Sequence, residues 1–171
     1  PGGTDQINTL SDDDRLTGTS ATDDRLEFDF VNDADTGDNN IAPTMSGIEI
    51  ANIKFATDSD ATLDLQDSTG FTHLNLHRID DENLARIDNI QEATTNNLSI
   101  NDAVTLTMNN AQVADVFIAE NRDTPAEGFE TVNVVSSGAA NSMVSLSTED
   151  VKTLNISGDQ DLSIFGTDDI I

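Results

Sequence analysis

The sequence contains no cysteine, no tryptophan and no tyrosine, and only seven lysine and arginine residues among its 171 positions. Without cysteine, the chain forms no disulfide bond, no thiolate metal site and no cysteine nucleophile. Without tryptophan and tyrosine, it lacks the aromatic platforms on which proteins usually stack sugars. Something other than covalent cross-links must therefore stabilise the fold.

Long hydrophobic runs are absent too. No apolar run approaches the roughly 18 residues of a membrane span, and residues 1–3 have neither the basic segment nor the apolar core of a signal peptide. We expect no membrane insertion. The length is that of one ordinary domain, and we expect an internal excerpt of a longer protein whose targeting signal lies elsewhere.

Acidic residues dominate the composition. Thirty-three Asp and Glu against seven Lys and Arg give a formal net charge of −26, which repels nucleic-acid phosphate and anionic membrane surfaces. Such like charge also destabilises a compact state unless divalent cations or concentrated salt neutralise it. Most of these acids are aspartate, the residue favoured in turns and in oxygen-ligand loops, so we predict calcium as the cofactor. The alternative is a solvated acidic surface suited to saline water.

From Gly47 onward, apolar and polar residues alternate over brief runs rich in Ile, Val, Leu and Thr. Alternation with period two is the signature of a β-strand. Turn-rich segments such as DSTG and SGDQD separate the runs, so strand follows strand at short spacing. We therefore predict an all-β fold.

One phrase of the sequence occurs twice. GIEIANIKF at Gly47–Phe55 returns as GFETVNVVS at Gly128–Ser136, and THLNL at Thr72–Leu76 returns as KTLNI at Lys152–Ile156. A short strand with one apolar face cannot bury that face alone, whereas stacked copies bury it against one another. The repeat favours a parallel β-solenoid with Asp-rich turns, and the alternative is a β-sandwich.

Each copy also contains two asparagines. Asn52 and Asn75 are 23 residues apart, and Asn133 and Asn155 are 22 apart, which suits one turn of a solenoid. In stacked parallel strands these residues would form a ladder of side-chain amides. In the alternative reading, each asparagine ends a strand of an unrelated sandwich.

The segment Ile79–Ala93 has two readings. Leu84, Ile87 and Ile90 have helical spacing, and the acids at positions 80–82 suit the first turn of one short helix. The letters ARIDNI within it also fit a further strand.

Four further phrases are LTGTSATDDRLEF at Leu16–Phe28, SGIEIANIKF at Ser46–Phe55, EGFETVNVVSSG at Glu127–Gly138 and VKTLNISGD at Val151–Asp159. They resemble phrases of large bacterial surface-layer proteins of the Caulobacter type and of their RTX-related secreted relatives. The resemblance implies type I secretion, a calcium-binding β-solenoid and assembly into a surface lattice. The strict RTX nonapeptide with its repeated glycines is missing, so a regular calcium ladder does not follow.

We divide the chain into residues 1–45, with acidic RTX-like calcium-binding turns and short strands, and residues 46–171, a solenoid-like domain with the internal repeat at 47–76 and 128–156. The sharpest metal candidate is Asp33, Asp35 and Asp38 around Gly37, because alternate carboxylates on a loop direct their oxygens at a common centre. An acidic loop without a metal is the alternative. Further candidates are Asp23 and Asp24, and Asp159 and Asp161.

His73 and His77 stand four residues apart. On a helix this spacing would suit zinc, but on a strand the two side chains are separated by about 13 Å and cannot share one ion. We therefore expect exposed or ladder histidines.

Catalytic motifs are missing from the sequence. There is no GxSxG, no phosphate-binding GxxxxGK[ST], and only two histidines to serve as a base. We expect no enzymatic activity. The predicted function is that of a secreted, calcium-binding structural segment of a surface layer or extracellular matrix, which self-assembles on the bacterial cell surface and contacts cell-surface polysaccharide. The alternative function is an RTX-type adhesin domain for surface or biofilm attachment.

Overall fold

The computed structural model describes residues 10–32, 40–57, 60–79, 85–90, 103–118, 129–148 and 151–168. These residues form β-strands and turns, and none of them is helical. Accordingly, the described ranges contain no helix that is long and apolar enough to cross a membrane. The strands are β1 (Arg15–Thr17), β2 (Arg25–Asn32), β3 (Asn40–Ile41), β4 (Thr44–Ser46), β5 (Ile50–Thr57), β6 (Ala61–Asp64), β7 (Ser68–Thr69), β8 (His73–Ile79), β9 (Ala85–Asp88), β10 (Ala103–Ile118), β11 (Thr131–Ser137), β12 (Asn141–Thr148), β13 (Thr153–Gly158) and β14 (Leu162–Asp168).

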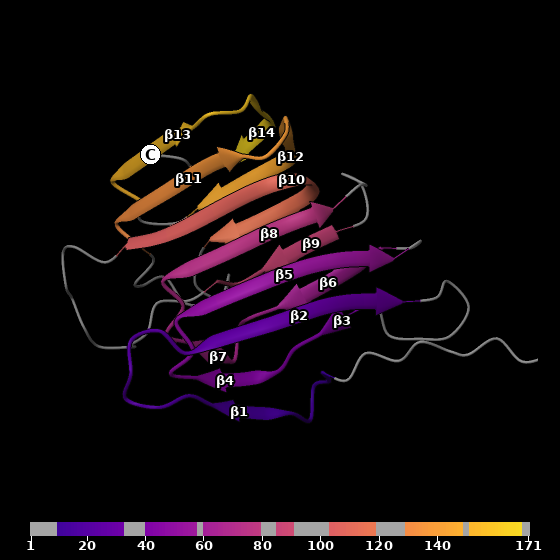
Figure 1. The fold of residues 1–171 in the computed structure, drawn as a ribbon, viewed down its shortest axis with the longest axis vertical. Helices are drawn as coiled ribbons and strands as arrows, with labels where there is room; N and C mark the ends of the chain where they lie inside the picture. The colour runs from indigo at the N-terminus through magenta and orange to yellow at the C-terminus, as the bar shows by residue number, and fades with distance from the viewer. Residues whose placement is uncertain are drawn as a thin grey trace, which may run out of the picture.

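The strands stack as the coils of a parallel β-solenoid (Figure 1). The first sheet runs β2, β5, β8, β10, β11, β13, and the second runs β3, β6, β9, β10, β12, β14. A small third sheet contains β1, β4 and β7. Every pairing among the described strands is parallel, and β10 belongs to both large sheets. The predicted solenoid is confirmed, and the sandwich alternative is wrong because a sandwich requires antiparallel neighbours.

Alternation of side chains directs one apolar residue in two toward the inside of the coil. Parallel register then places these residues above one another in interior columns. One such column contains Leu74, Leu106 and Val134, all completely buried. Burying a side chain of this size contributes about 1.5–3 kcal/mol, so the stacked columns supply the main stabilisation of a fold without disulfides.

A sharp corner joins the first sheet to the second. Arg78 and Asn110 lie side by side at this corner and both have positive φ, 53° and 54°. Gly138 follows the β11 residue that opposes Asn109, and its φ is 75°. The left-handed corner therefore repeats in three neighbouring coils. Asn110 and Gly138 adopt this conformation readily, whereas it is uncommon for a residue such as Arg78.

The side chain of Asn141 closes the same corner from within. It is 3% exposed, and its Oδ1 accepts a hydrogen bond from the backbone N–H of Ala111 at 2.8 Å. Its Nδ2 donates to Ser136 Oγ, and to the carbonyls of Ser137 and Ala139, at 2.8–3.0 Å. One buried amide thus satisfies the polar groups of two coils where the backbone turns.

The segment 79–93 contains a strand in its described part. Ala85–Asp88 forms β9, which pairs in parallel with β6 and β10. Ala85 and Ile87 face the core while Arg86 faces solvent, which is the alternation of a strand. The helical reading is wrong for 85–90, because pairing on both sides outweighs the local helical spacing.

Strands on both sides of position 45 belong to the same sheets. β1 pairs with β4, and β2 pairs with β5 over eight residues, from Arg25 opposite Ile50 to Asn32 opposite Thr57. The first described residues therefore form the first coil of the solenoid.

Candidate functional site

The repeated phrases perform the same structural task in both copies. The carbonyl oxygen of Glu49 accepts hydrogen bonds from the backbone N–H groups of Thr72 and His73 at 2.9 and 3.0 Å. In the second copy, the carbonyl oxygen of Glu130 accepts from Lys152 and Thr153 at 2.9 and 3.0 Å. The phrases GIE and GFE thus each precede the strand of one coil, and the phrases THLNL and KTLNI begin the strand of the next coil.

The four predicted ladder asparagines form two separate pairs. Asn75 Nδ2 donates to Asn52 Oδ1 at 2.7 Å, and Asn155 Nδ2 donates to Asn133 Oδ1 at 2.9 Å. The amide of Asn52 also donates to Glu27 Oε1 in the first coil.

One continuous amide ladder does not form because β10 lies between the pairs. Thr107 of β10 is opposite Asn75, whereas Thr105 is opposite Asn133. The second pair is therefore displaced by two residues along the strands. In β10 the position next to each asparagine pair is occupied by a threonine.

The turn before β2 contains Asp23 and Asp24. Oδ2 of Asp24 accepts hydrogen bonds from the backbone N–H and the hydroxyl of Thr19 at 2.6 and 2.8 Å. The backbone N–H of Asp24 donates to Glu49 Oε2 at 3.0 Å. Asp24 therefore closes its own turn and links it to the next coil, whereas Asp23 is exposed.

Asp159 and Asp161 lie in the turn after β13, at the opposite end of the solenoid. Both are exposed, and the turn folds back over Ser136. Ser136 accepts from the backbone N–H of Asp159 at 3.0 Å through its carbonyl, and its hydroxyl donates to the carbonyl of Asp161 at 3.1 Å. Because β2 and β13 are the outermost strands of the first sheet, the two predicted carboxylate pairs are not brought together.

The remaining predicted ligands, Asp33, Asp35 and Asp38, lie outside the described residues. Among the residues that are described, no three His, Cys, Asp or Glu side chains gather where they could hold one metal ion. Calcium also accepts backbone carbonyls, amide oxygens and water as ligands, so exposed acidic turns can bind it with few carboxylates.

His73 and His77 both lie on the outer side of β8, with Asn75 between them. Nδ1 of His73 is 3.0 Å from the hydroxyl of Thr72. Opposite them in β10 are Thr105 and Asn109, so they belong to a polar outer surface.

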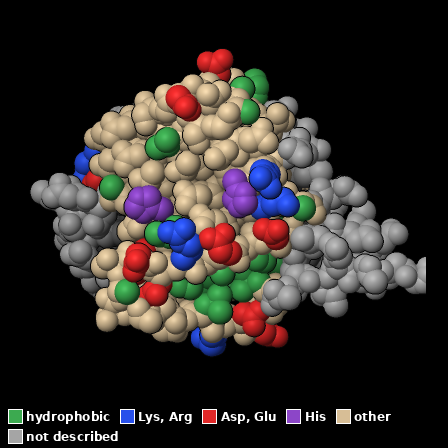
Figure 2. Space-filling model, in the orientation of Figure 1, with side chains coloured by type: hydrophobic (Ala, Val, Ile, Leu, Met, Phe, Trp, Pro, Cys, Tyr) green, Lys and Arg blue, Asp and Glu red, His purple; other side chains and the backbone are tan. Residues whose placement is uncertain are grey.

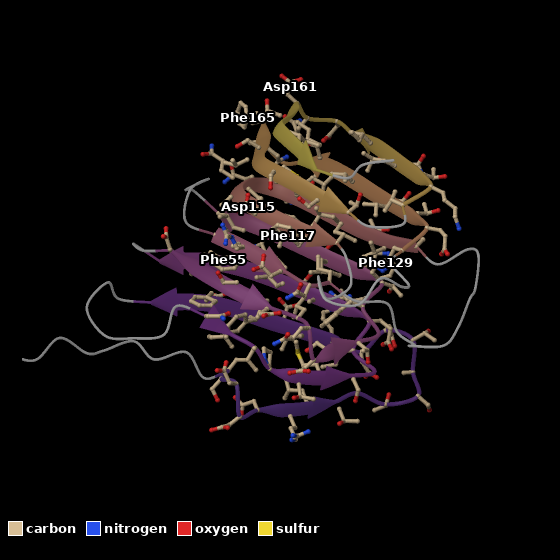
Figure 3. All side chains as sticks on the ribbon, turned by 180° about the vertical axis from the view of Figure 1, so that it is seen from behind. Phe55, Asp115, Phe117, Phe129, Asp161 and Phe165 are labelled. Atoms are coloured by element: carbon tan, nitrogen blue, oxygen red, sulfur yellow. The ribbon has the colours of Figure 1, made fainter. Side chains whose placement is uncertain are left out.

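Asp115 is a connecting residue that the sequence did not reveal. Its carboxylate accepts from Arg86 Nη2 at 2.6 Å and from Ser145 Oγ at 2.8 Å, on the coils to either side (Figure 3). These contacts depend on the register between segments about 30 residues apart in the sequence. No local sequence pattern predicts which residues of such distant segments meet.

The acids are distributed unevenly over the fold. Only six of the 33 lie in strands that the structure describes, namely Glu27, Asp29, Asp64, Asp88, Asp115 and Asp168. The strands β8, β11 and β13 contain no acid, nor does β10 before Asp115. The negative charge is therefore concentrated outside these strands.

The outer side of these four strands forms a neutral surface, which we call the amide-hydroxyl face. In Figure 2 the upper part of the first sheet is mostly tan, with the two purple histidines below it. Its outward residues are His73, Asn75, His77, Thr105, Thr107, Asn109, Thr131, Asn133, Val135, Ser137, Thr153, Asn155 and Ser157.

No protein-family model matches the chain, and comparisons with curated proteins and with solved structures find no match either.

Proposed function

We propose that the chain is a structural segment of a secreted surface-layer or extracellular-matrix protein, which binds calcium in its acidic turns and self-assembles on a bacterial surface. The observation that carries the proposal is the placement of the acids. The described strands of a regular solenoid contain only six of the 33 acids of a chain whose net charge is −26, and described turns contain Asp23, Asp24, Asp159 and Asp161. The sequence resemblance to surface-layer and RTX-related proteins supports the same function.

Calcium would act by removing electrostatic repulsion between coils. Turns of neighbouring coils lie close to one another because paired strands are about 4.8 Å apart, and Asp24 in the turn before β2 contacts Glu49 of the next coil in this way. Their mutual repulsion opposes folding, and bound Ca²⁺ converts it into bridging attraction. The ion would stabilise the coil in calcium-rich surroundings and leave the chain loosely folded, and therefore exportable, where calcium is scarce.

The test is a titration of the purified chain, first held in excess EDTA. Circular dichroism with thermal melting reports folding, and light scattering reports assembly. We expect strand signal and melting temperature to rise with calcium and far less with magnesium, with particle growth at the same step. Equal folding in EDTA and in calcium would overturn the calcium mechanism. If magnesium, or NaCl of equal ionic strength, raised the strand signal and melting temperature as much as calcium does, the effect would be general charge screening and not calcium binding.

The amide-hydroxyl face favours a second candidate, an adhesin domain that binds a neutral polysaccharide. Amide and hydroxyl groups such as those of Asn133 and Thr107 donate and accept hydrogen bonds in the manner that sugar hydroxyls require.

Dextran, a neutral polysaccharide, is a suitable probe for this second candidate. We expect the substitution Thr107→Glu to abolish retention on a dextran column, whereas Gln112→Glu, on the exposed outer side of the same strand, leaves it unchanged. Absence of retention for the unsubstituted chain would reject the adhesin candidate for this class of glycan.

A further inference from the structure

The residues of the amide-hydroxyl face are ordered in columns that cross the coils. Parallel register places one residue of each of β8, β10, β11 and β13 directly beside the next. The first column contains His73, Thr105, Asn133 and Asn155. The second column lies two residues further along the strands and contains Asn75, Thr107, Val135 and Ser157. Because paired strands are about 4.8 Å apart, each column extends for about 14 Å over its four coils.

The two columns present neutral hydrogen-bonding groups to solvent. All eight residues are exposed or partly exposed, all but Val135 have a polar side chain, and none is Asp, Glu, Lys or Arg. The direction along the strands is different. Glu130 precedes β11, and β13 lies between Lys152 and Asp159. An extended ligand that crosses the coils therefore meets only neutral side chains, whereas one that follows these strands meets charges where they end.

Hydrogen bonds between coils hold the asparagine side chains of the columns in place. Asn155 Nδ2 donates to Asn133 Oδ1 at 2.9 Å, and Asn75 Nδ2 donates to Asn52 Oδ1 of β5 at 2.7 Å. A carboxamide has two N–H donors and an oxygen with two lone pairs, so one ladder bond leaves each amide with further hydrogen-bonding capacity. Groups already fixed in this way lose little side-chain entropy when a ligand binds.

We propose that the amide-hydroxyl face binds an internal stretch of an extended, linear, uncharged polysaccharide, which lies across the strands along the axis of the solenoid with successive sugar units on successive coils. The proposal names the ligand and its orientation for the adhesin candidate above, and so it rests on that function. An open sheet face presents its groups side by side and encloses no chain end, so it recognises the middle of a polymer. A further coil would lengthen the columns and would leave them uncovered.

The length of the sugar chain is the first test. Cellobiose, cellotetraose and cellohexaose are linear, extended and uncharged, and NMR titration of the 171-residue chain gives the dissociation constant of each. We expect cellotetraose to bind more than about tenfold more tightly than cellobiose, because the longer chain forms hydrogen bonds on more coils. Cellohexaose should gain less than about threefold over cellotetraose, because the columns cross four described coils.

A matched pair of asparagines tests the orientation. Asn155 is on the last described coil of the first column, whereas Asn109 is on β10 beyond both columns, and both side chains are exposed. Asn155→Ala should weaken cellotetraose by at least about threefold and leave cellobiose, which can bind on other coils, unchanged. Asn109→Ala should change neither affinity. Circular dichroism of both variants checks that the fold is retained. The opposite result, with loss only in Asn109→Ala, would mean that the sugar chain follows β10 and would overturn the proposed orientation.

The remaining outcomes separate this ligand from the adhesin candidate itself. Equal affinity for cellobiose and cellohexaose overturns recognition of an extended chain and leaves the adhesin candidate standing. Retention on dextran without binding of any of the three cello-oligosaccharides does the same. If neither dextran nor the cello-oligosaccharides bind, the candidate and this ligand are rejected together. Self-association in sedimentation equilibrium that Thr107→Glu abolishes would assign the face to a second copy of the chain and would also overturn the proposal.

Discussion

Asn75 donates its side-chain amide to Oδ1 of Asn52 at 2.7 Å, and the two residues are directly opposed on β8 and β5. Asn155 makes the corresponding bond to Asn133 on the last coil, but this pair is exposed whereas the first is partly buried. A matched comparison of the two pairs is therefore possible within one protein.

The substitution Asn75→Ala should lower the free energy of unfolding by about 1 kcal/mol, because a half-buried amide acceptor on Asn52 loses its partner. Asn155→Ala should cost less than about 0.5 kcal/mol, since water replaces the lost bond. Urea unfolding followed by circular dichroism measures both. Equal costs for the two substitutions would contradict the role of burial.

Asn141 should be far more sensitive. Asn141→Ala removes every polar contact of a buried side chain and leaves the N–H of Ala111 without its acceptor, so we expect a loss of about 3 kcal/mol. Ser163→Ala, on the exposed side of β14, serves as the control and should change stability by less than about 0.5 kcal/mol. A small effect of Asn141→Ala would show that water enters the corner.

Gly138 tests the left-handed corner. A Cβ added there would lie 2.2 Å from Oδ1 of Asn109, and φ is 75°. Gly138→Ala should destabilise by about 2 kcal/mol, from strain and clash together. In a background of Asn109→Ala the clash disappears, and about 1 kcal/mol of backbone strain should remain. Thermal unfolding of the four proteins separates the two contributions, and an unchanged cost in the second background would mean that the clash contributes nothing.

Asp23 and Asp24 should respond differently to calcium. Asp24→Asn weakens the hydrogen bonds from Thr19 and should lower the melting temperature in EDTA as well as in calcium. Asp23 is exposed, so Asp23→Asn should leave the melting temperature in EDTA unchanged and reduce only the increase that calcium produces. Isothermal titration calorimetry gives the calcium affinity directly. If Asp23→Asn binds calcium as the unsubstituted chain does, this turn is not a calcium site.

Several features of the fold could be predicted from the sequence because they are local or periodic. Alternation in phrases such as HLNLH predicted strands, and the duplicated GxE phrase predicted stacked coils. The segment around Ile87 was ambiguous because its apolar residues fit two periods. Pairing of β9 on both sides resolved it, and no local pattern reports that pairing.

The candidate site was less accessible from sequence. Asp24 and Asp161 were singled out as carboxylates, but the structure places them at opposite ends of the solenoid, and Asp24 is occupied in closing its own turn. Conversely, Asp115 gave no signal, although it links three coils through Arg86 and Ser145.

The sequence by itself determined the class of fold, because period-two hydrophobicity and a repeated phrase are properties of neighbouring letters and of self-similarity. It also determined the acidic character of the turns. Only the tertiary structure decided the register of β10, which displaces the pair of Asn133 from that of Asn75 by two residues. The tertiary structure also decided that Phe30 is covered while Ile156 is open. Register and burial arise from contacts between coils. Because the coils differ in length, the residues that oppose one another are determined only when the whole chain folds.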